Sequence, residues 1–579
     1  MIPKVKNIEK GGGIAVAFFL LISGFLYFRF IVPYHLYFKE QIQLFIYDST
    51  YVLSYFSKPA GIACLTGDFL TQFLYLKGGG AVVISLLFVL TWLLIVRILH
   101  SFGIKQLAAL LALIPVIAEW GIIGEIYSSL AMPVAFALVL LSIYIYILIR
   151  NKTLSLVLGI AFIPFLYWAL GSAMFLFPVF VSLYEIHQGK KRYLYWLTLF
   201  VLAAIIPILL RSYFLITVKQ AYFYPYPGTK QAICLCIAAA IFFLANLKVL
   251  RKLRVTVLIF SLTAFFTLIF WIGELILTTD LNREKILAMA SEAYFENWDK
   301  VLKIAEKSKS ENQIATYYTN IALSKQMQSG DRMMEFYQPF VSGLFLPVNP
   351  DSGWFVIFFS SDVFYYIGEM NMAQHSAMLG MTFSPFQRSS RMIRRLAEIN
   401  IVDGDIPGAM KYIRMLESSM FHRKAAARLK ALASHPDNRL QTKRSQIQTG
   451  DILHSAFDLQ SSLELLAKTN PDNRAALDYL LAFHLMNKNI PAFFNAYSSY
   501  YKDKTNYVPK AYAEALLIYF AGAKVKPEVL RDYQINPQIV KDFTEYTRLY
   551  ESSGGNLELL QEKFPHTYWL FYHFATLKK

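Results

Sequence analysis

Residues 80–99 read GAVVISLLFVLTWLLIVRIL, and the stretch carries a single charged side chain, Arg97. A helix that crosses a bilayer needs about 20 mostly apolar residues, because each residue adds about 1.5 Å toward a hydrocarbon core about 30 Å thick. The stretch therefore predicts a membrane-spanning helix. Eight other stretches have the same character, so nine spans are predicted, at 13–34, 80–99, 104–123, 129–149, 154–169, 171–187, 193–211, 231–248 and 255–277.

The apolar residues are concentrated in the first half of the chain. Of 579 residues, 56% are hydrophobic and only 16% are charged, which lies outside the usual range of soluble proteins. Long uncharged runs extend from Gly12 to Leu277, and charged residues return at ordinary density from Asp280. We therefore expect an all-α protein with a polytopic membrane domain over 1–280 and a water-soluble helical domain over 281–579.

The positions of lysine and arginine predict how the spans are oriented, since loops rich in these residues stay in the cytoplasm. With nine spans, fourteen such residues fall on the side of the amino terminus and six on the opposite side. Counting 154–187 as one span would place the clusters 190–192 and 248–254 outside, so a bend at Gly171-Ser172 is expected to divide that stretch. The amino terminus is then cytoplasmic, and residues 281–579 lie in the periplasm beyond a bacterial inner membrane.

Three further features limit the possible functions. The first apolar run is longer than the 7–15-residue core of a cleaved signal peptide, and no small-x-small site follows it before Tyr34, so the first span is expected to be retained. The net charge of +17 reflects mainly the cytoplasmic loops and indicates no nucleic-acid partner. Cys64, Cys234 and Cys236 form no Cys-x-x-Cys pair, so neither a disulfide framework nor a thiolate metal site is indicated.

The first outer loop, about 38–77, has helical periodicity. Apolar residues recur at helical spacing from Ile42 to Phe56, the segment 58–61 (Lys-Pro-Ala-Gly) interrupts them, and a second stripe runs from Leu65 to Leu76. These stripes predict two helices lying on the membrane surface. Such helices would hold three carboxylates at that depth, those of Glu40, Asp48 and Asp68.

Other charged residues are expected on the same side of the membrane. They are Glu119 and Glu125 in the second outer loop, Arg211 and Lys219 in a later one, and Arg29 near the outer end of the first span. A carboxylate there could deprotonate an acceptor or hold a divalent metal, and a cation could neutralise a leaving phosphate. Helix capping and snorkelling would explain the same residues without any chemistry.

Acids in the first two outer loops, interface-lying helices after the first span and a periplasmic carboxy-terminal domain make residues Phe18 to about Leu277 similar to the GT-C class of polytopic glycosyltransferases. The resemblance implies sugar transfer from a polyprenyl-phosphate donor. Glu40 or Asp48 would be the first-loop acid and Glu125 or Glu119 the second-loop acid, with Arg211, Lys219 and Arg29 facing the donor phosphate. The first loop departs from that class because it has no Asp-Asp, Asp-Glu or Asp-x-Asp pair.

The soluble half reads as helical hairpins. Turns are predicted at 296–297, 329–331, 403–405 and 487–489, each between two helical segments, and the first two turns are separated by nearly the 34-residue tetratricopeptide period. We expect an irregular, tetratricopeptide-like α-solenoid. Its default use is to hold a peptide or a partner protein, and no His-Glu-x-x-His, Walker or Gly-x-Ser-x-Gly motif indicates an enzyme there.

The whole chain also resembles a family of multi-span proteins of Gram-negative bacteria that have repeat-containing carboxy-terminal halves. The resemblance rests on Glu40-Gln41, Leu44-Phe45, Gln72-Phe73, Asn297-Trp298 and 320–323 (Asn-Ile-Ala-Leu), and it implies an architecture rather than a reaction. Two functions are therefore expected from the sequence. One is a glycosyltransferase whose helical domain grips the acceptor, and the other is a non-catalytic membrane scaffold for assembling envelope proteins. A transporter is less favoured, because the spans contain few charges and no repeated half.

Overall fold

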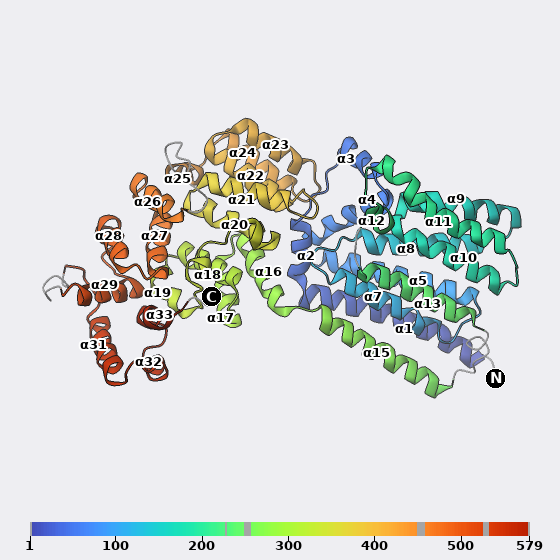
Figure 1. Cartoon of the computed structure of the whole chain (residues 1–579), viewed down its shortest axis with the longest axis horizontal. Helices are drawn as coiled ribbons and strands as arrows, with labels where there is room; N and C mark the ends of the chain where they lie inside the picture. The colour runs from blue at the N-terminus through green and yellow to red at the C-terminus, as the bar shows by residue number, and fades with distance from the viewer. Residues whose placement is uncertain (1–2, 226–228, 248–255, 448–457, 525–531, 577–579) are drawn as a thin grey trace. The chain divides into compact units, whose positions relative to one another are not determined.

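A computed structural model describes residues 3–225, 229–247, 256–447, 458–524 and 532–576, and every regular element in these ranges is helical. The prediction of an all-α protein is therefore confirmed for this part of the chain. The chain forms two compact units, of which the first comprises Met1–Leu281 with Ser418–His422 and the second comprises Asn282–Glu417 with Arg423–Lys579. Figure 1 shows the helices of both units.

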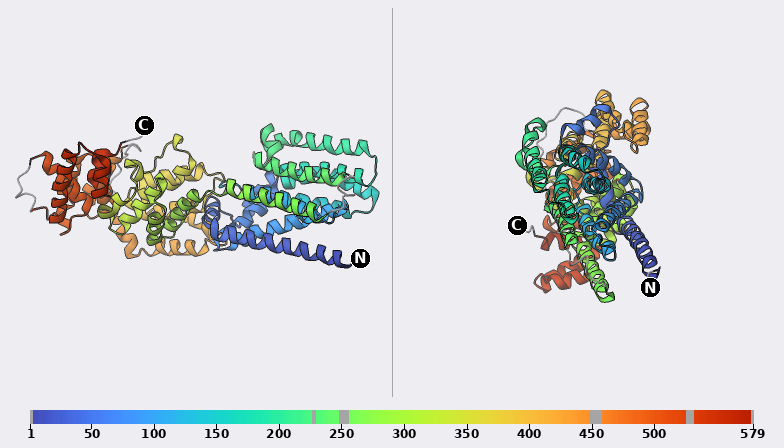
Figure 2. Two further views of the ribbon diagram at one scale, coloured as in Figure 1. Left: turned by 90° about the horizontal axis from the view of Figure 1, so that it is seen from below. Right: turned by 90° about the vertical axis from the view of Figure 1, so that its right-hand side faces the viewer.

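The first unit is built from long apolar helices. They are α1 Pro3–Leu26, α5 Gly79–Ser101, α8 Ala131–Leu148, α9 Lys152–Leu170, α11 Tyr193–Phe214, α13 Thr229–Asn246 and α15 Val257–Thr278, with the shorter α6 Ala108–Leu111, α7 Leu113–Ile123, α10 Leu176–His187 and α12 Val218–Phe223. Helix α5 packs between α1 and α8, and α7 packs against α13 and α15. In Figures 1 and 2 the long helices run in roughly the same direction, as helices that share a bilayer do.

Six segments of the described chain are long and apolar enough to cross a membrane: 13–31, 79–101, 131–148, 152–187, 193–214 and 257–278. The protein is therefore a membrane protein. The predicted spans near 104–123 and 231–248 correspond to the shorter apolar helices 108–123 and 232–246. The predicted break in 154–187 is present, since α9 ends at Leu170 and Gly171 has a φ of +64°.

The first outer loop differs from its prediction. It contains three short helices, α2 Pro33–Gln41, α3 Ser49–Ser54 and α4 Gly61–Thr71, and the predicted continuous helix from Ile42 to Phe56 is wrong. No helix covers residues 43–48, and Asp48 has the extended backbone of a helix N-cap. Within the first unit, the Tyr47 backbone N–H donates to the Ser418 carbonyl at 2.7 Å, a partner that the local pattern does not reveal.

The second unit consists of shorter helices joined by tight turns. They are α16 Leu281–Tyr294, α17 Trp298–Ser308, α18 Gln313–Lys325, α19 Ser329–Arg332, α20 Trp354–Ile367, α21 Met370–Thr382, α22 Ser390–Asp403, α23 Ile406–Glu417, α24 Arg423–Ser434, α25 Asn438–Gln446, α26 Leu459–Thr469, α27 Arg474–Met486, α28 Ile490–Tyr500, α29 Lys510–Gly522, α31 Pro537–Ser552, α32 Leu557–Lys563 and α33 Tyr568–Phe574. Successive helices pack on one another through most of this array.

Two of the four predicted hairpins are present as packed pairs, α22/α23 and α27/α28, and α16 and α17 flank the first predicted turn at 296–297. The second predicted hairpin is wrong, because α18 is followed by the one-turn α19 and no α-helix covers Met333 to Tyr337. Gln338, which is buried, instead exchanges side-chain hydrogen bonds with Asn320 and donates to the Met333 carbonyl. The hairpin α20/α21 was not predicted, although its two helices pack closely together.

Candidate functional site

The predicted first-loop acids have different surroundings. Asp48 is exposed, and its Oδ1 accepts a hydrogen bond from the Tyr51 backbone N–H at 3.0 Å, so it caps α3. Helix capping explains this aspartate without a catalytic role, because an N-cap carboxylate accepts hydrogen bonds from backbone N–H groups that have no partner within the first helical turn. The residue therefore fits the non-catalytic interpretation of its position.

Glu40 lies at the end of α2 and is buried. Its Oε1 is 2.6 Å from Nε2 of His422, a residue of the same unit whose ring packs against that of Tyr75. Sequence reasoning could not pair these residues, because 382 positions separate them. The carboxylate thus belongs to a buried acid–imidazole pair in the first unit.

A third carboxylate of the loop, Asp68, accepts hydrogen bonds from side chains of two different segments. Its Oδ2 accepts from the Tyr55 hydroxyl at 2.6 Å and its Oδ1 from the Ser129 hydroxyl at 3.4 Å, which joins the first outer loop to the second. Burial, followed by the charge of Asp68, raises the pKa of the Tyr55 hydroxyl far above its ordinary value. These bonds indicate a structural tie between the two loops.

Glu125 lies among cations from other loops. Its Oε1 is 3.2 Å from Nζ of Lys230, and both side chains are about half exposed. Lys39 is buried and donates to the Ile123 carbonyl and to the Ser128 hydroxyl, both at 2.7 Å. Burial lowers the pKa of Lys39 to about 7, although the charge of Glu125 opposes this shift. Sequence reasoning missed Lys39.

The other predicted residues are dispersed. Glu119 is buried in α7, and neither carboxylate oxygen makes a hydrogen bond within the described part of the chain. Arg29 lies over the ring of Phe30, while Arg211 and Lys219 are exposed on α11 and α12. Across the described ranges, no group of three or more His, Cys, Asp or Glu side chains is arranged to hold a metal.

The second unit contains a larger site, which we call the cationic pocket. It encloses about 730 Å³, within the range of ligand sites. Its walls carry more cations than acids, together with several aromatic rings. The cations are Lys325, Arg391, Arg394, Arg395, Arg428, Arg439, Lys443 and Arg474, the acids are Glu296, Asp362, Glu398 and Asp437, and the rings are Tyr294, Trp298, Tyr365 and Tyr366.

The three arginines of α22 are neutralised by acids inside the pocket. Asp362 accepts from Arg391 at 2.5 Å and from Arg395 at 3.0 Å, and Glu398 accepts from Arg394 and Arg395 at 2.8 Å each. Burial alone would raise the pKa of Asp362, but the two arginines hold it below its ordinary value. These pairs engage Asp362 and Glu398, and the other two acids of the pocket, Glu296 and Asp437, form no ion pair with either lysine among the described residues.

The two lysines of the pocket form no ion pair with any described residue. Lys443 donates to the Tyr366 carbonyl at 2.7 Å, and Nζ of Lys325 lies 4.3 Å from the centre of the Tyr366 ring. Desolvation by the pocket walls, followed by the charges of Lys325 and Arg395, lowers the pKa of Lys443 to about 7. A bound anion would relieve this repulsion.

Sequence signals for this pocket exist but are weak. Asp362 interrupts the apolar helix α20, and three arginines recur at helical spacing in α22. A charge in an apolar run needs a partner, so these positions could have been matched. Lys325 and Lys443 gave no signal of their own, because isolated lysines on helices are ordinary surface residues.

A family model described as "Family of unknown function (DUF6057)" matches residues 8–575, almost the entire chain. No curated protein and no solved structure matches this chain.

Proposed function

The chain belongs to this family of unknown function, and we propose that it is a non-catalytic, membrane-anchored scaffold whose helical array holds an acidic segment of a partner protein. The apolar helices would fix it in the bilayer. The observation that carries the proposal is the cationic pocket, where Lys325 and Lys443 lie beside aromatic rings and neither forms a close ion pair with a described residue. Clusters of cations are a recurring means of binding acidic motifs, and helical arrays commonly bind peptides.

Binding of a model acidic peptide to the full-length protein in nanodiscs tests the proposal. Hexaglutamate should bind at least about tenfold more tightly than hexaglutamine, and added salt should weaken it, because the contacts are between charges. Lys443→Met and Lys325→Met should each reduce the affinity about three- to tenfold. Lys303→Met is the matched control, since Lys303 is an exposed lysine of α17 that does not line the pocket.

Two results would contradict the scaffold proposal. One is equal binding of the two peptides, and the other is an affinity that both pocket lysine variants leave unchanged.

We also propose a second candidate function, glycosyl transfer at the outer loops. It is supported by the position of Glu125, 3.2 Å from Lys230 and near enough to Lys39 to affect the pKa of that lysine. An acid beside cations from separate loops is what transfer from a phosphate-linked donor requires.

Glu125→Gln, Glu40→Gln and Asp48→Asn, compared at matched expression, test this second function. Glycans on envelope proteins should be reduced at least tenfold in Glu125→Gln if the enzyme hypothesis holds. The enzyme hypothesis would be contradicted if glycans were unchanged in all three variants while removal of 283–579 still abolished the phenotype. The scaffold would then be the only one of the two candidate functions to remain.

A further inference from the structure

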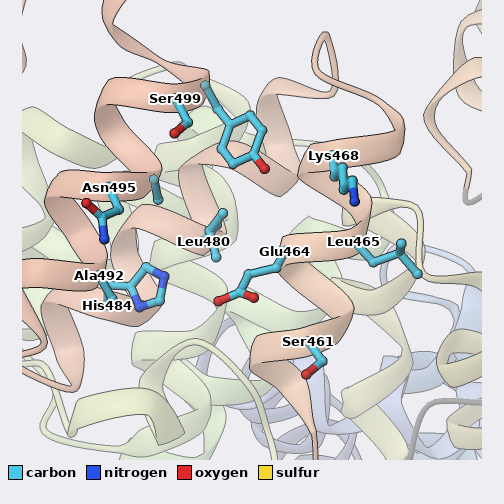
Figure 3. A pocket seen from close by; sticks show the side chains of 11 residues that line it. Ser461, Glu464, Leu465, Lys468, Leu480, His484, Ala492, Asn495 and Ser499 are labelled. Carbon is cyan, nitrogen blue, oxygen red and sulfur yellow. The ribbon is translucent and has the colours of Figure 1, made fainter.

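A second concave site, which we call the polar groove, lies in the last third of the chain. Figure 3 shows that three consecutive helices line it. Helix α26 contributes Ser461, Glu464, Leu465 and Lys468, α27 contributes Leu480 and His484, and α28 contributes Ala492, Asn495, Ala496, Ser499 and Tyr500. Within each helix these residues recur three or four positions apart, so each helix presents one face to the groove. The groove encloses about 510 Å³, enough for a small ligand.

The floor of the groove holds an unsatisfied polar atom. His484 is only 2% exposed, and its Nδ1 has no hydrogen-bond partner in the described part of the chain. Leaving a buried nitrogen unpaired costs free energy, so such an atom beside a cavity points to a ligand. Burial lowers the pKa of the imidazole, although the charge of Glu464 opposes this shift, so the ring is neutral at pH 7.

The groups around His484 define the chemistry of an occupant. In Figure 3 the Glu464 carboxylate and the His484 ring point toward one another, and Asn495 and Ser499 project from α28. Lys468 balances the charge of Glu464, so the groove has no net charge. Glu464 Oε1 already accepts a hydrogen bond from the Gln460 amide at 2.8 Å, but an apolar ligand would leave His484 Nδ1 unpaired, and an anion would meet the Glu464 carboxylate.

We propose that the polar groove binds a neutral carbohydrate of one to three sugar units. Each sugar hydroxyl both donates and accepts, which matches a wall of carboxylate, amide, hydroxyl and neutral imidazole groups. Leu480 and Ala492 offer small apolar contacts for the faces of a sugar ring. This site is separate from the cationic pocket, because Ala475 of that pocket and His484 are nine residues apart on α27 and so project from opposite sides of the helix.

The test uses the full-length protein in nanodiscs and saturation-transfer NMR. The probes are maltotriose and triacetylchitotriose as neutral sugars, trigalacturonic acid as an anionic sugar, and a capped Gly-Ser hexapeptide as a neutral peptide. At least one neutral sugar should bind saturably, more tightly than the other two probes. Glu464→Gln and Ser499→Trp should weaken it about tenfold, because one removes an acceptor and the other fills the groove.

Matched variants make the outcome decisive. Glu558→Gln changes an exposed glutamate outside the groove, and Lys443→Met changes only the cationic pocket, so neither should alter sugar binding. Unchanged thermal melting of the two groove variants would show that they still fold. The proposal is overturned if neither neutral sugar binds, if the hexapeptide binds more tightly, or if both groove variants bind like the unaltered protein.

Discussion

Two kinds of cation lie in the cationic pocket, and they have different roles. Arg391 is only 2% exposed and is paired with Asp362, so its removal would leave a buried charge without a partner and destabilise the second unit. Lys443 contacts a backbone carbonyl and a ring but no acid. We therefore expect the three arginines of α22 to support the fold and the two lysines to be available for a ligand.

Lys443→Met should stabilise the second unit in a manner that depends on pH. Desolvation, with the charges of Lys325 and Arg395, lowers the folded-state pKa from 10.5 to about 7. Between pH 7 and pH 10.5 the unfolded chain binds more protons than the folded chain. The contribution of Lys443 to the free energy of unfolding therefore rises with pH across this range and is lowest below pH 7. The variant should melt about 2 °C or more higher than the unaltered protein at pH 6.

The difference in melting temperature between Lys443→Met and the unaltered protein should be smaller at pH 9, because Lys443 is then neutral in the folded state. Circular dichroism melting at both pH values measures it, with Lys303→Met as the control that should melt like the unaltered protein. A difference of the same size at both pH values would contradict the low pKa of Lys443.

The sequence indicated candidate residues but not their partners. Asp48 was recognised both as a catalytic candidate and as a helix cap, and the structure places it at a cap. Glu40 was recognised as an acid of the outer loop, yet its contact with His422 depends on the tertiary fold and not on any local pattern. Lys325 and Lys443 were missed because their burial and repulsion arise from helices far apart in the sequence.

Helices were predicted well where an apolar pattern continues over several turns. Helices α22 and α23, for example, follow from their apolar spacing and from the turn at Gly404, which has a φ of +83°. The pattern failed between Ile42 and Asp48, where the same spacing occurs in chain without regular secondary structure. There, the contacts of Phe45 with Phe69 and of Tyr47 with Ser418 determine the backbone instead.

The junction between α9 and α10 depends on a single glycine. Gly171 has a φ of +64°, and a Cβ at this position would come within 2.4 Å of the Tyr224 carbonyl oxygen and 2.9 Å of the Ala60 Cβ. Gly171→Ala should therefore destabilise the first unit by about 2 kcal/mol or more, through both strain and a clash. Thermal denaturation in detergent, followed by size-exclusion chromatography, measures the loss.

Gly189→Ala separates these two causes. Gly189 also has a positive φ of +71°, but a Cβ there would meet nothing within 4 Å, so only strain should remain and the loss should be about 1 kcal/mol. Equal losses for the two variants would argue against the close packing of Gly171 on Tyr224 and Ala60.

Across the whole chain, the number of crossings decides which side of the membrane the second unit occupies. If only the six long segments cross, both ends of the chain lie on one side. The cations at 150–152 and 248–254 would then face away from the cytoplasm. If α9 and α10 cross separately, and 108–123 and 232–246 also cross, there are nine crossings and those cations face the cytoplasm.

The charge pattern favours nine crossings, so we expect residues 281–579 to lie in the periplasm. Alkaline phosphatase fused after Lys579 should be active and green fluorescent protein at the same position should be dark. Fusions after Gly189, in the turn between α10 and α11, should give the opposite result. Strong fluorescence from the fusion after Lys579 would mean an even number of crossings and a cytoplasmic second unit. The scaffold would then have to bind its acidic partner inside the cell, and an odd number of the nine predicted segments would fail to cross the membrane.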